Sequence, residues 1–284
     1  MKINDILSII EKLLPKSTAI DGDRIGLQVQ SGRSEISHIL VTMELSDEVI
    51  DEAIDLSADC IISFHPLIYR PLTEIVEIER VGRLVTKIIK NEIAFISVHT
   101  TFDAHSEGTS KIIADLLGLC VVSFLVPTPN CANSGIGVIC EARQPMNEQE
   151  LVKLVSEKLF APVKYTSGKK TENITKIGIV GGSGTSFLKD ALDANLDAFI
   201  TADVTYHTFH SVKGKLLLID PGHYEMEQFV SLGIAQLIKN HSDNSVKISV
   251  SSVNTNPVSY YPDNNWKPLQ NEYLRNVKIN WNKQ

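Results

Sequence analysis

The side chains of this sequence that could do chemistry fall into pairs of titratable residues four positions apart. Such spacing puts two side chains on one face of a helix. Imidazoles and carboxylates without nearby thiolates form the ligand set of a divalent ion such as zinc, manganese or iron. Carboxylates can also bridge two ions about 3.5 to 4 Å apart, the geometry that clamps the attacking and leaving oxygens in hydrolysis. The pairs are His99 and Asp103, Asp203 and His207, and His223 and Glu227.

Each pair follows an apolar run of strand character, and so does His65 in the stretch 58-ADCIISFHPLIYRPL-72. Open α/β sheets bind their ligands at the carboxyl ends of strands. For any one pair, a role as a helix cap or turn is the simpler interpretation. Four strand ends that all offer acids or imidazoles favour one shared metal site. Helical spacing is best supported for His223 and Glu227, because Pro221 and Gly222 end the strand before a helix-periodic run.

The elements that must position these residues follow an α/β pattern. Short β-branched runs alternate with helical patterns, which is typical of a layered α/β architecture with a partly parallel sheet. Ser46 is the expected N-cap of a helix with an acidic first turn, and Gly118 is the expected end of another. Expected strands include 38–45, 93–100, 135–142, 176–182, 197–204, 215–222 and 246–254, and expected helices include 1–15, 46–56, 80–91, 110–118, 147–160, 187–196 and 225–240.

The Pro-containing stretch VPTPNCANSG at 126–135 is interpreted as the crossing into a second module. We therefore expect a first α/β domain over 1–120 plus 220–256 and a second over 121–219. Residues 257–284 form an aromatic C-terminal extension that contains both tryptophans. Aromatic side chains favour an extension packed on its own subunit or a neighbour, and a disordered tail is the alternative.

Composition excludes several classes of function. The chain has 27 basic and 34 acidic residues among 284, for a formal charge of −7, and this balance does not favour nucleic acid as a partner. Asp5 and Glu11 interrupt the N-terminal apolar pattern, which argues against the apolar core of a signal peptide. No segment reaches the roughly 20 apolar residues of a membrane span. The four cysteines form no CxxC pair, so buried thiols in a reducing cytoplasm are expected rather than disulfides or a cysteine zinc site.

Two further segments have open interpretations. The run GIVGGSGT at 178–185 could cradle a phosphate with backbone N–H groups, or it could be a tight turn from strand to helix. It lacks the lysine of a P-loop and does not fit GxGxxG. In 21-DGDRIGLQVQSG-32, Asp23 could line a site or cap a loop, and the loop is favoured.

Taken in order, six motifs of this sequence resemble those of the NIF-three-like family of dinuclear-metal-centre proteins, often labelled GTP cyclohydrolase 1 type 2 homologs. The resemblance covers nearly the whole chain to about Pro257. It implies two interlinked α/β domains with a metal cleft between them, and an assembly of six subunits. The motifs are DRIGLQV, SFHPLIY, VHTTFDAHSEG, KIGIVGGSG, DAFITADVTYHTFH and IDPGHYEMEQ.

The resemblance also implies roles for individual residues. It makes His65 a metal ligand and Asp103 the residue that bridges two ions, with His223 and Glu227 completing the site. It places His99 close by, either as a ligand or as a residue that contacts a ligand. Asp203 and His207 match a motif that lines the same cleft. The expected cofactor is one or two divalent ions per subunit: zinc, iron or manganese.

One departure from the family pattern concerns the metal count. Family members usually carry two histidines before the proline of the SFHPLIY motif, whereas this sequence has Phe64 at the first position. Phenylalanine cannot coordinate, so one ion loses a nitrogen ligand. A second ion would then need water, His99 or another group in its place.

Two functions are consistent with these observations. The first is a metal-dependent hydrolase of a nucleotide or another phosphate-containing small molecule, with His99 or His207 transferring protons. The second is a non-catalytic, metal-carrying or regulatory homohexamer, which the missing ligand at Phe64 favours. A cytoplasmic location is expected for either.

Overall fold

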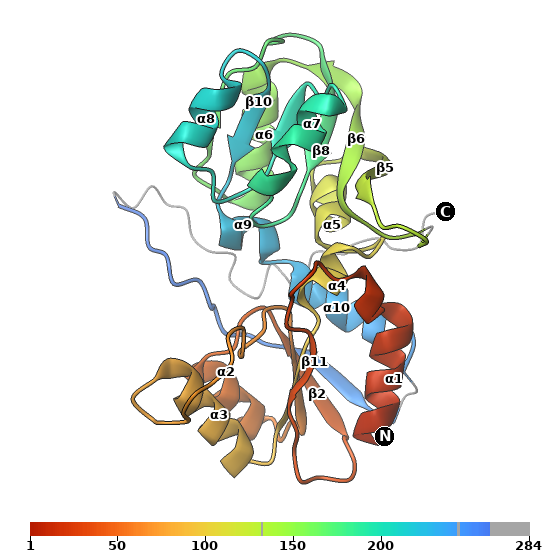
Figure 1. Cartoon of the computed structure of the whole chain (residues 1–284), viewed down its shortest axis with the longest axis vertical. Helices are drawn as coiled ribbons and strands as arrows, with labels where there is room; N and C mark the ends of the chain where they lie inside the picture. The colour runs from red at the N-terminus through yellow and green to blue at the C-terminus, as the bar shows by residue number, and fades with distance from the viewer. Residues whose placement is uncertain (132, 243–244, 262–284) are drawn as a thin grey trace. The chain divides into compact units, whose positions relative to one another are not determined.

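The computed structural model describes residues 1–131, 133–242 and 245–261, which form two compact α/β units (Figure 1). Unit 1 comprises Met1–Phe102 and Val230–Thr255, and unit 2 comprises Asp103–Phe229 together with 256–261 of the described residues. Residues 103–229 of unit 2 are therefore inserted between the two segments of unit 1, and 256–261 follow the second segment. This division groups 103–120 and 220–229 with unit 2, whereas the sequence analysis placed them in the first domain.

Unit 1 contains a five-stranded sheet in the order β1-β4-β3-β2-β11. Strands β4, β3, β2 and β11 run parallel, and β1 pairs with β4 antiparallel. The elements of the unit are α1 (Ile3–Leu13), η1 (Lys16–Thr18), β1 (Gly26–Val29), β2 (His38–Thr42), α2 (Asp47–Asp55), β3 (Cys60–Ser63), α3 (Arg80–Lys90), β4 (Ala94–Ser97), α4 (His99–Asp103, whose last residue begins unit 2), α10 (Val230–Lys239) and β11 (Lys247–Val250).

The sheet of unit 1 lies between two helical layers, with α2 and α3 on one face and α1 and α10 on the other (Figure 1). Strands β2, β3 and β4 are buried at every position, as expected for parallel strands covered on both faces. Ser46 caps α2 as predicted, since its side chain accepts a hydrogen bond from the Val49 amide at 3.3 Å. Within the segment 21–32, the apolar part forms strand β1, and Asp23 precedes that strand.

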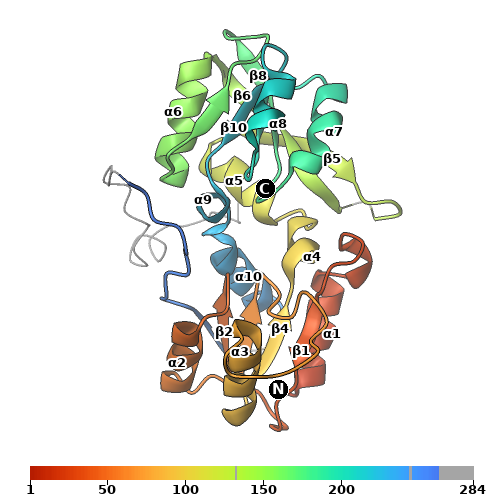
Figure 2. The same ribbon diagram turned by 60° about the vertical axis from the view of Figure 1, so that its left-hand side comes forward.

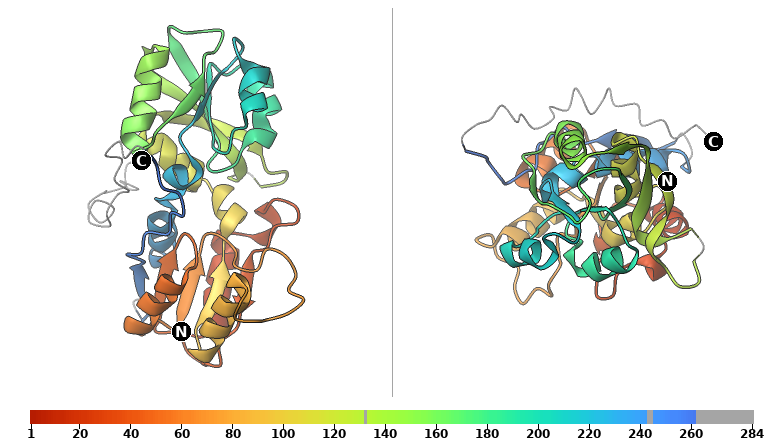
Figure 3. Two further views of the ribbon diagram at one scale, coloured as in Figure 1. Left: turned by 90° about the vertical axis from the view of Figure 1, so that its left-hand side faces the viewer. Right: turned by 90° about the horizontal axis from the view of Figure 1, so that it is seen from above.

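Unit 2 contains a six-stranded sheet in the order β5-β6-β8-β9-β10-β7, with β8, β9 and β10 parallel. Helices α7 and α8 lie on one face and α6 on the other (Figures 2 and 3). The elements of the unit are α5 (Thr109–Leu116), β5 (Cys120–Pro127), β6 (Gly135–Met146), α6 (Glu148–Leu159), β7 (Lys164–Thr166), β8 (Ile174–Ile179), η2 (Thr185–Phe187), α7 (Leu188–Asp193), β9 (Ala198–Ile200), α8 (Tyr206–Val212), β10 (Leu217–Asp220) and α9 (His223–Glu227).

Two segments of unit 2 differ from the sequence expectation. The stretch at 126–135 does not lead into a new module, because β5 and β6 on either side of it pair antiparallel within one sheet. The single helix expected over 225–240 is divided into α9 and α10. Gln228 follows α9 and donates its side-chain amide to Leu159 O at 3.0 Å, which ties the end of α9 to α6. The helical spacing of apolar residues over 225–240 did not by itself reveal this break.

The cysteines are free thiols, and two of them, Cys60 and Cys140, are buried as expected. Burial raises the pKa of Cys140 to about 12, so this thiol stays protonated. Cys120 is exposed on the outer strand β5, contrary to the expectation of burial. Within the described ranges, no helix has the length and apolar character needed to cross a membrane.

Asp197 is a structural carboxylate that precedes β9. Its Oδ2 accepts hydrogen bonds from the amides of Thr175 and Lys176 at 2.9 and 3.0 Å, and from Lys170 Nζ at 3.0 Å. Burial opposes ionisation, but these donors outweigh it and lower the pKa of Asp197 below its ordinary 3.8. We expect Asp197→Asn to lower the free energy of unfolding by about 1 to 3 kcal/mol at pH 7.

Because the folded pKa is depressed, this stabilisation is complete above the unfolded value and is lost as the pH falls through the folded one. Urea unfolding should therefore show a difference that shrinks below about pH 4. The matched control is Asp193→Asn, which removes an exposed partner of Lys189 and should change stability by less than about 0.5 kcal/mol. A difference of the same size at pH 7 and at pH 3 would contradict a depressed folded pKa of Asp197.

Candidate functional site

The carboxyl ends of three parallel strands in unit 1 present a group of polar side chains. Strands β2, β3 and β4 are in register, so the residues that follow them emerge at one edge of the sheet. These residues are Glu44, His65 and His99. The rings of His65 and His99 lie 5.4 Å apart between centroids. Two of the predicted strand-end residues, His65 and His99, therefore lie side by side at this edge.

His65 is oriented by Glu44. Its Nδ1 lies 3.0 Å from Glu44 Oε2, while Arg80 contacts the other oxygen of that carboxylate at 2.8 Å. Burial opposes ionisation of Glu44, but His65 and Arg80 lower its pKa below the ordinary value. A carboxylate on Nδ1 makes Nε2 the ligand atom of a histidine, which is the arrangement found around metal-bound imidazoles.

His99 has the same arrangement with a different carboxylate. Its Nδ1 lies 2.7 Å from Asp23 Oδ1, and the other carboxylate oxygen accepts hydrogen bonds from the Thr100 amide and hydroxyl. Burial opposes ionisation, but these contacts lower the pKa of Asp23 to about 2. His99 has a φ of 24°, a left-handed conformation that costs energy in a residue with a side chain. The backbone is held in this conformation at a residue predicted to transfer protons.

Phe64 fills the space beside these two histidines and is fully buried. Its ring centroid lies 5.0 Å from that of His65 and 5.5 Å from that of His99, and it packs edge-on against Phe102 at 6.3 Å. The backbone stays in the sheet register past the strand end, because the amides of Phe64 and His65 donate to Thr42 O and Met43 O. Phe64 is thus a core residue of unit 1.

Unit 2 holds a second group of predicted site residues, with Asp203 in the segment after β9 and His223 and Glu227 on α9. His223 Nδ1 lies 2.7 Å from Asp203 Oδ2, and His223 Nε2 lies 2.9 Å from Glu227 Oε2. The predicted four-residue pair on a helix is confirmed, since α9 begins at His223 and ends at Glu227. Burial lowers the pKa of His223, but Glu227 and Asp203 raise it to about 9. The group formed by Asp203, His223 and Glu227 is therefore suited to binding a positive charge, either a proton on His223 or a cation.

The two remaining predicted residues of unit 2 have different surroundings. Asp103 Oδ1 accepts a hydrogen bond from the Thr109 hydroxyl at 2.5 Å. His207 lies on α8, its ring 5.5 Å from that of the exposed Tyr206. Asp203 pairs with His223 and not with His207, because α8 begins only at Tyr206 and the two residues do not share a helix. The four-residue spacing of Asp203 and His207 therefore does not place their side chains on one face of a helix.

The donor chemistry of these residues fits a divalent ion. Three imidazoles at strand ends each have Nδ1 against a carboxylate, and the Glu227 carboxylate is 3% exposed beside the Nε2 of one of them. Nitrogen and oxygen donors of this kind suit zinc, iron or manganese.

Of the carboxylates that orient histidines, sequence reasoning missed Glu44 and favoured a loop cap for Asp23 over a place in a site. Glu44 lies 21 residues before His65, at the end of an expected strand, and Asp23 lies 76 residues before His99. A signal for Glu44 existed in its position, since it follows a strand at the same edge as His65. For Asp23 the sequence carried only the weak indication of an acid in a polar segment.

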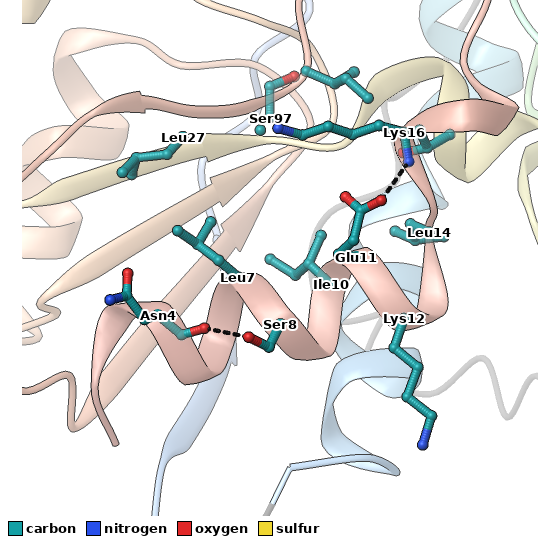
Figure 4. A pocket seen from close by; sticks show the side chains of 13 residues that line it. Asn4, Leu7, Ser8, Ile10, Glu11, Lys12, Leu14, Lys16, Leu27 and Ser97 are labelled. Carbon is teal, nitrogen blue, oxygen red and sulfur yellow. Dashed lines mark hydrogen bonds between the residues drawn. The ribbon is translucent and has the colours of Figure 1, made fainter.

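Unit 1 also contains a pocket of about 700 Å³ formed by α1, the segment that follows it, and strands β1 and β4 (Figure 4). Leu7, Ile10 and Leu27 line it, and the side chain of Lys16 extends along its upper side as drawn. The predicted site residues are not among those that line this pocket. It is therefore distinct from the groups of histidines.

The fold and these residues define a two-domain α/β protein with imidazoles and carboxylates at the carboxyl ends of its parallel strands. The chain belongs to the Duf34/NIF3 (NGG1p interacting factor 3) family, which matches residues 1–257. This confirms the resemblance drawn from the six motifs, and the match ends where the C-terminal extension begins.

Individual relatives are similar along nearly their whole length. A GTP cyclohydrolase 1 type 2 homolog of Clostridium perfringens is 32% identical over 261 residues, which cover 92% of this chain and 100% of that protein. One from Streptomyces coelicolor is 31% identical over 265 residues, which cover 90% and 93%. The crystal structure of Staphylococcus aureus protein SA1388 has a TM-score of 0.83 at 25% identity and covers 92% of this chain and 99% of its own.

Proposed function

We propose that this protein is a metal-dependent hydrolase that acts on a nucleotide or another phosphate-containing small molecule. The proposed ligands of one or two divalent ions are His65, Asp103, His223 and Glu227. The observation that carries the proposal is the pairing of three strand-end imidazoles with carboxylates at Nδ1. Such pairing fixes the tautomer that ligation by Nε2 requires.

A bound divalent ion would supply Lewis acidity and lower the pKa of water toward neutrality. The residues of the chain have separate tasks. His99 is the proposed proton carrier, because the Asp23 carboxylate at 2.7 Å stabilises the imidazolium that forms when its Nε2 takes up a proton. Asp23 stays ionised throughout, since its pKa is about 2. His207 is the second candidate for proton transfer, from α8 of unit 2.

The substrate class follows from the chemistry of the site and the names of the relatives. The relatives are described as GTP cyclohydrolase 1 type 2 homologs, which suggests a nucleotide. The net charge of −7 does not favour a polyanionic substrate, but a divalent ion in the site would outweigh it locally. We further propose that the protein is a homohexamer.

The test combines metal analysis with a hydrolysis screen. Purified protein should contain at least one zinc, iron or manganese ion per subunit and should hydrolyse at least one nucleotide or phosphodiester when that metal is added. Asp103→Ala should lower kcat by more than about 100-fold. The matched control is Asp115→Ala, which removes a half-exposed acid that pairs with Lys111 in the same unit and should leave kcat within about twofold of wild type. Less than one bound ion per subunit, or a kcat that Asp103→Ala does not change, would contradict the proposal.

A second candidate function is a non-catalytic, metal-carrying or regulatory assembly. Phe64 favours it, because this ring is fully buried at the position where the motif resemblance implies a ligand histidine. The same experiment separates the two functions. Stoichiometric metal without turnover on any nucleotide or phosphodiester would support the second function over the first.

A further inference from the structure

The glycine-rich turn at 180–184 follows β8, and its amides do not form the phosphate cradle that its sequence suggested. The Gly181 amide donates to Ser110 Oγ at 3.1 Å, and the Gly184 amide donates to Thr201 Oγ1 at 2.8 Å. Amides that cradle a phosphate must point toward the ligand. These two instead donate to side chains of the protein, so the turn interpretation is favoured over the phosphate cradle.

Gly182 lies directly against the Glu227 carboxylate. A Cβ built on Gly182 would lie 2.2 Å from Glu227 Oε1 and 3.4 Å from His223 Cε1. The φ of Gly182 is +62°, so the backbone conformation also favours glycine. The carboxylate has little room to move, because it is buried and its Oε2 contacts His223 Nε2 at 2.9 Å. Only a residue without a side chain leaves Glu227 where it is.

Gly181 lies against the residue that holds Asp103. A Cβ on Gly181 would lie 2.4 Å from Thr109 Cγ2, and Thr109 is itself buried. The hydroxyl of Thr109 donates to Asp103 Oδ1 at 2.5 Å. A side chain at position 181 would therefore displace Thr109, whose hydroxyl orients the Asp103 carboxylate.

The turn is itself anchored to the neighbouring strand. Gly182 O accepts hydrogen bonds from the Ala202 amide at 2.8 Å and from Thr201 Oγ1 at 3.0 Å. Both donors follow directly on β9, the strand that leads to Asp203. The turn thus has a fixed position within unit 2 from which it can act on the carboxylates beside it.

We propose that Gly181 and Gly182 are positioning residues for the two carboxylates that unit 2 contributes to metal binding, Asp103 and Glu227. Gly182 acts by direct contact with Glu227, and Gly181 acts through Thr109. The proposal rests on the proposed metal-binding function for its consequence, but the contacts themselves exist without a metal. It predicts that a methyl group on either glycine displaces a ligand while the fold persists.

The test compares Gly182→Ala with Gly214→Ala. Gly214 has a φ of +72° and nothing within 4 Å of its Cβ position, so its substitution imposes a similar backbone strain without a clash. Zinc titration by calorimetry should show that Gly182→Ala weakens affinity about 10- to 100-fold, and Gly181→Ala by a smaller factor in the same direction. Gly214→Ala should leave zinc affinity within about threefold of wild type. Zinc affinity of Gly182→Ala equal to that of Gly214→Ala would overturn the proposal.

A second measurement, made in the presence of a chelator, tests the positioning of Glu227 by Gly182 even if the wild-type protein binds no zinc. Gly182→Ala should lower the urea midpoint of unfolding by more than Gly214→Ala does. On a Glu227→Ala background this extra loss should disappear, because the atoms that clash are gone. Additive losses would overturn the positioning role. Failure of wild type to bind zinc, iron or manganese, combined with non-additive losses, would refute the proposed function and leave the positioning of Glu227 standing.

Discussion

Glu227→Gln is expected to lower the zinc affinity of this protein by at least about 100-fold. Loss of a group that merely orients a ligand costs about 10- to 100-fold, and loss of a charged ligand should cost more. Glutamine keeps the shape of the buried side chain and its contact with Gly182, so the change isolates the negative charge beside His223 Nε2. Calorimetric titration of metal-free protein with zinc measures the effect.

The matched control is Glu225→Gln on the same helix. Glu225 is also buried, and its Oε1 accepts a hydrogen bond from the Tyr260 hydroxyl at 2.9 Å. Both substitutions remove one buried negative charge from α9, but only Glu227 is a proposed ligand. Zinc affinity of Glu225→Gln should stay within about threefold of wild type. Equal losses for the two variants would show that helix charge, and not ligation, decides the affinity.

Phe64→Ala is expected to lower the free energy of unfolding by about 3 to 5 kcal/mol. The ring is fully buried and packs against the rings of His65, His99 and Phe102, so its removal leaves a cavity that the sheet edge cannot close. Urea unfolding of metal-free protein measures the loss. Tyr69→Ala is the control, because that ring is 58% exposed in the same segment and its loss should cost less than about 0.5 kcal/mol.

Phe64→His separates packing from coordination at this position. Without metal, a buried imidazole with no assured hydrogen-bond partner should cost about 1 to 3 kcal/mol. With excess zinc the variant should regain stability, because a ligand that binds only the folded state stabilises it. The added nitrogen would lie beside His65 and His99, so about one more ion per subunit is expected than in wild type. Unchanged metal content would mean that Phe64 alone does not explain a reduced metal count.

Much of the local structure could be predicted from the sequence. Ser46 was identified as an N-cap because a hydroxyl before an acidic first turn satisfies a helix amide, and its contact with Val49 confirms this. His223 and Glu227 were identified as neighbours on a helix, since that relation depends only on four-residue spacing after a strand-breaking proline and glycine. A partly parallel sheet was also predicted, because short β-branched runs alternate with helical patterns along the chain.

Only the tertiary structure decided which carboxylate orients which histidine. Asp23 reaches His99 across 76 positions, and Asp203 reaches His223 rather than His207. These partners are set by strand order and by the turns that follow each strand, which hydrophobic periodicity does not specify. The role of Gly182 depended likewise on the approach of a turn to a helix 45 residues away in sequence. The sequence by itself determined which residue types stand at the strand ends, and the packing of the strands determined their partners, because long-range pairing brings together residues that no local pattern connects.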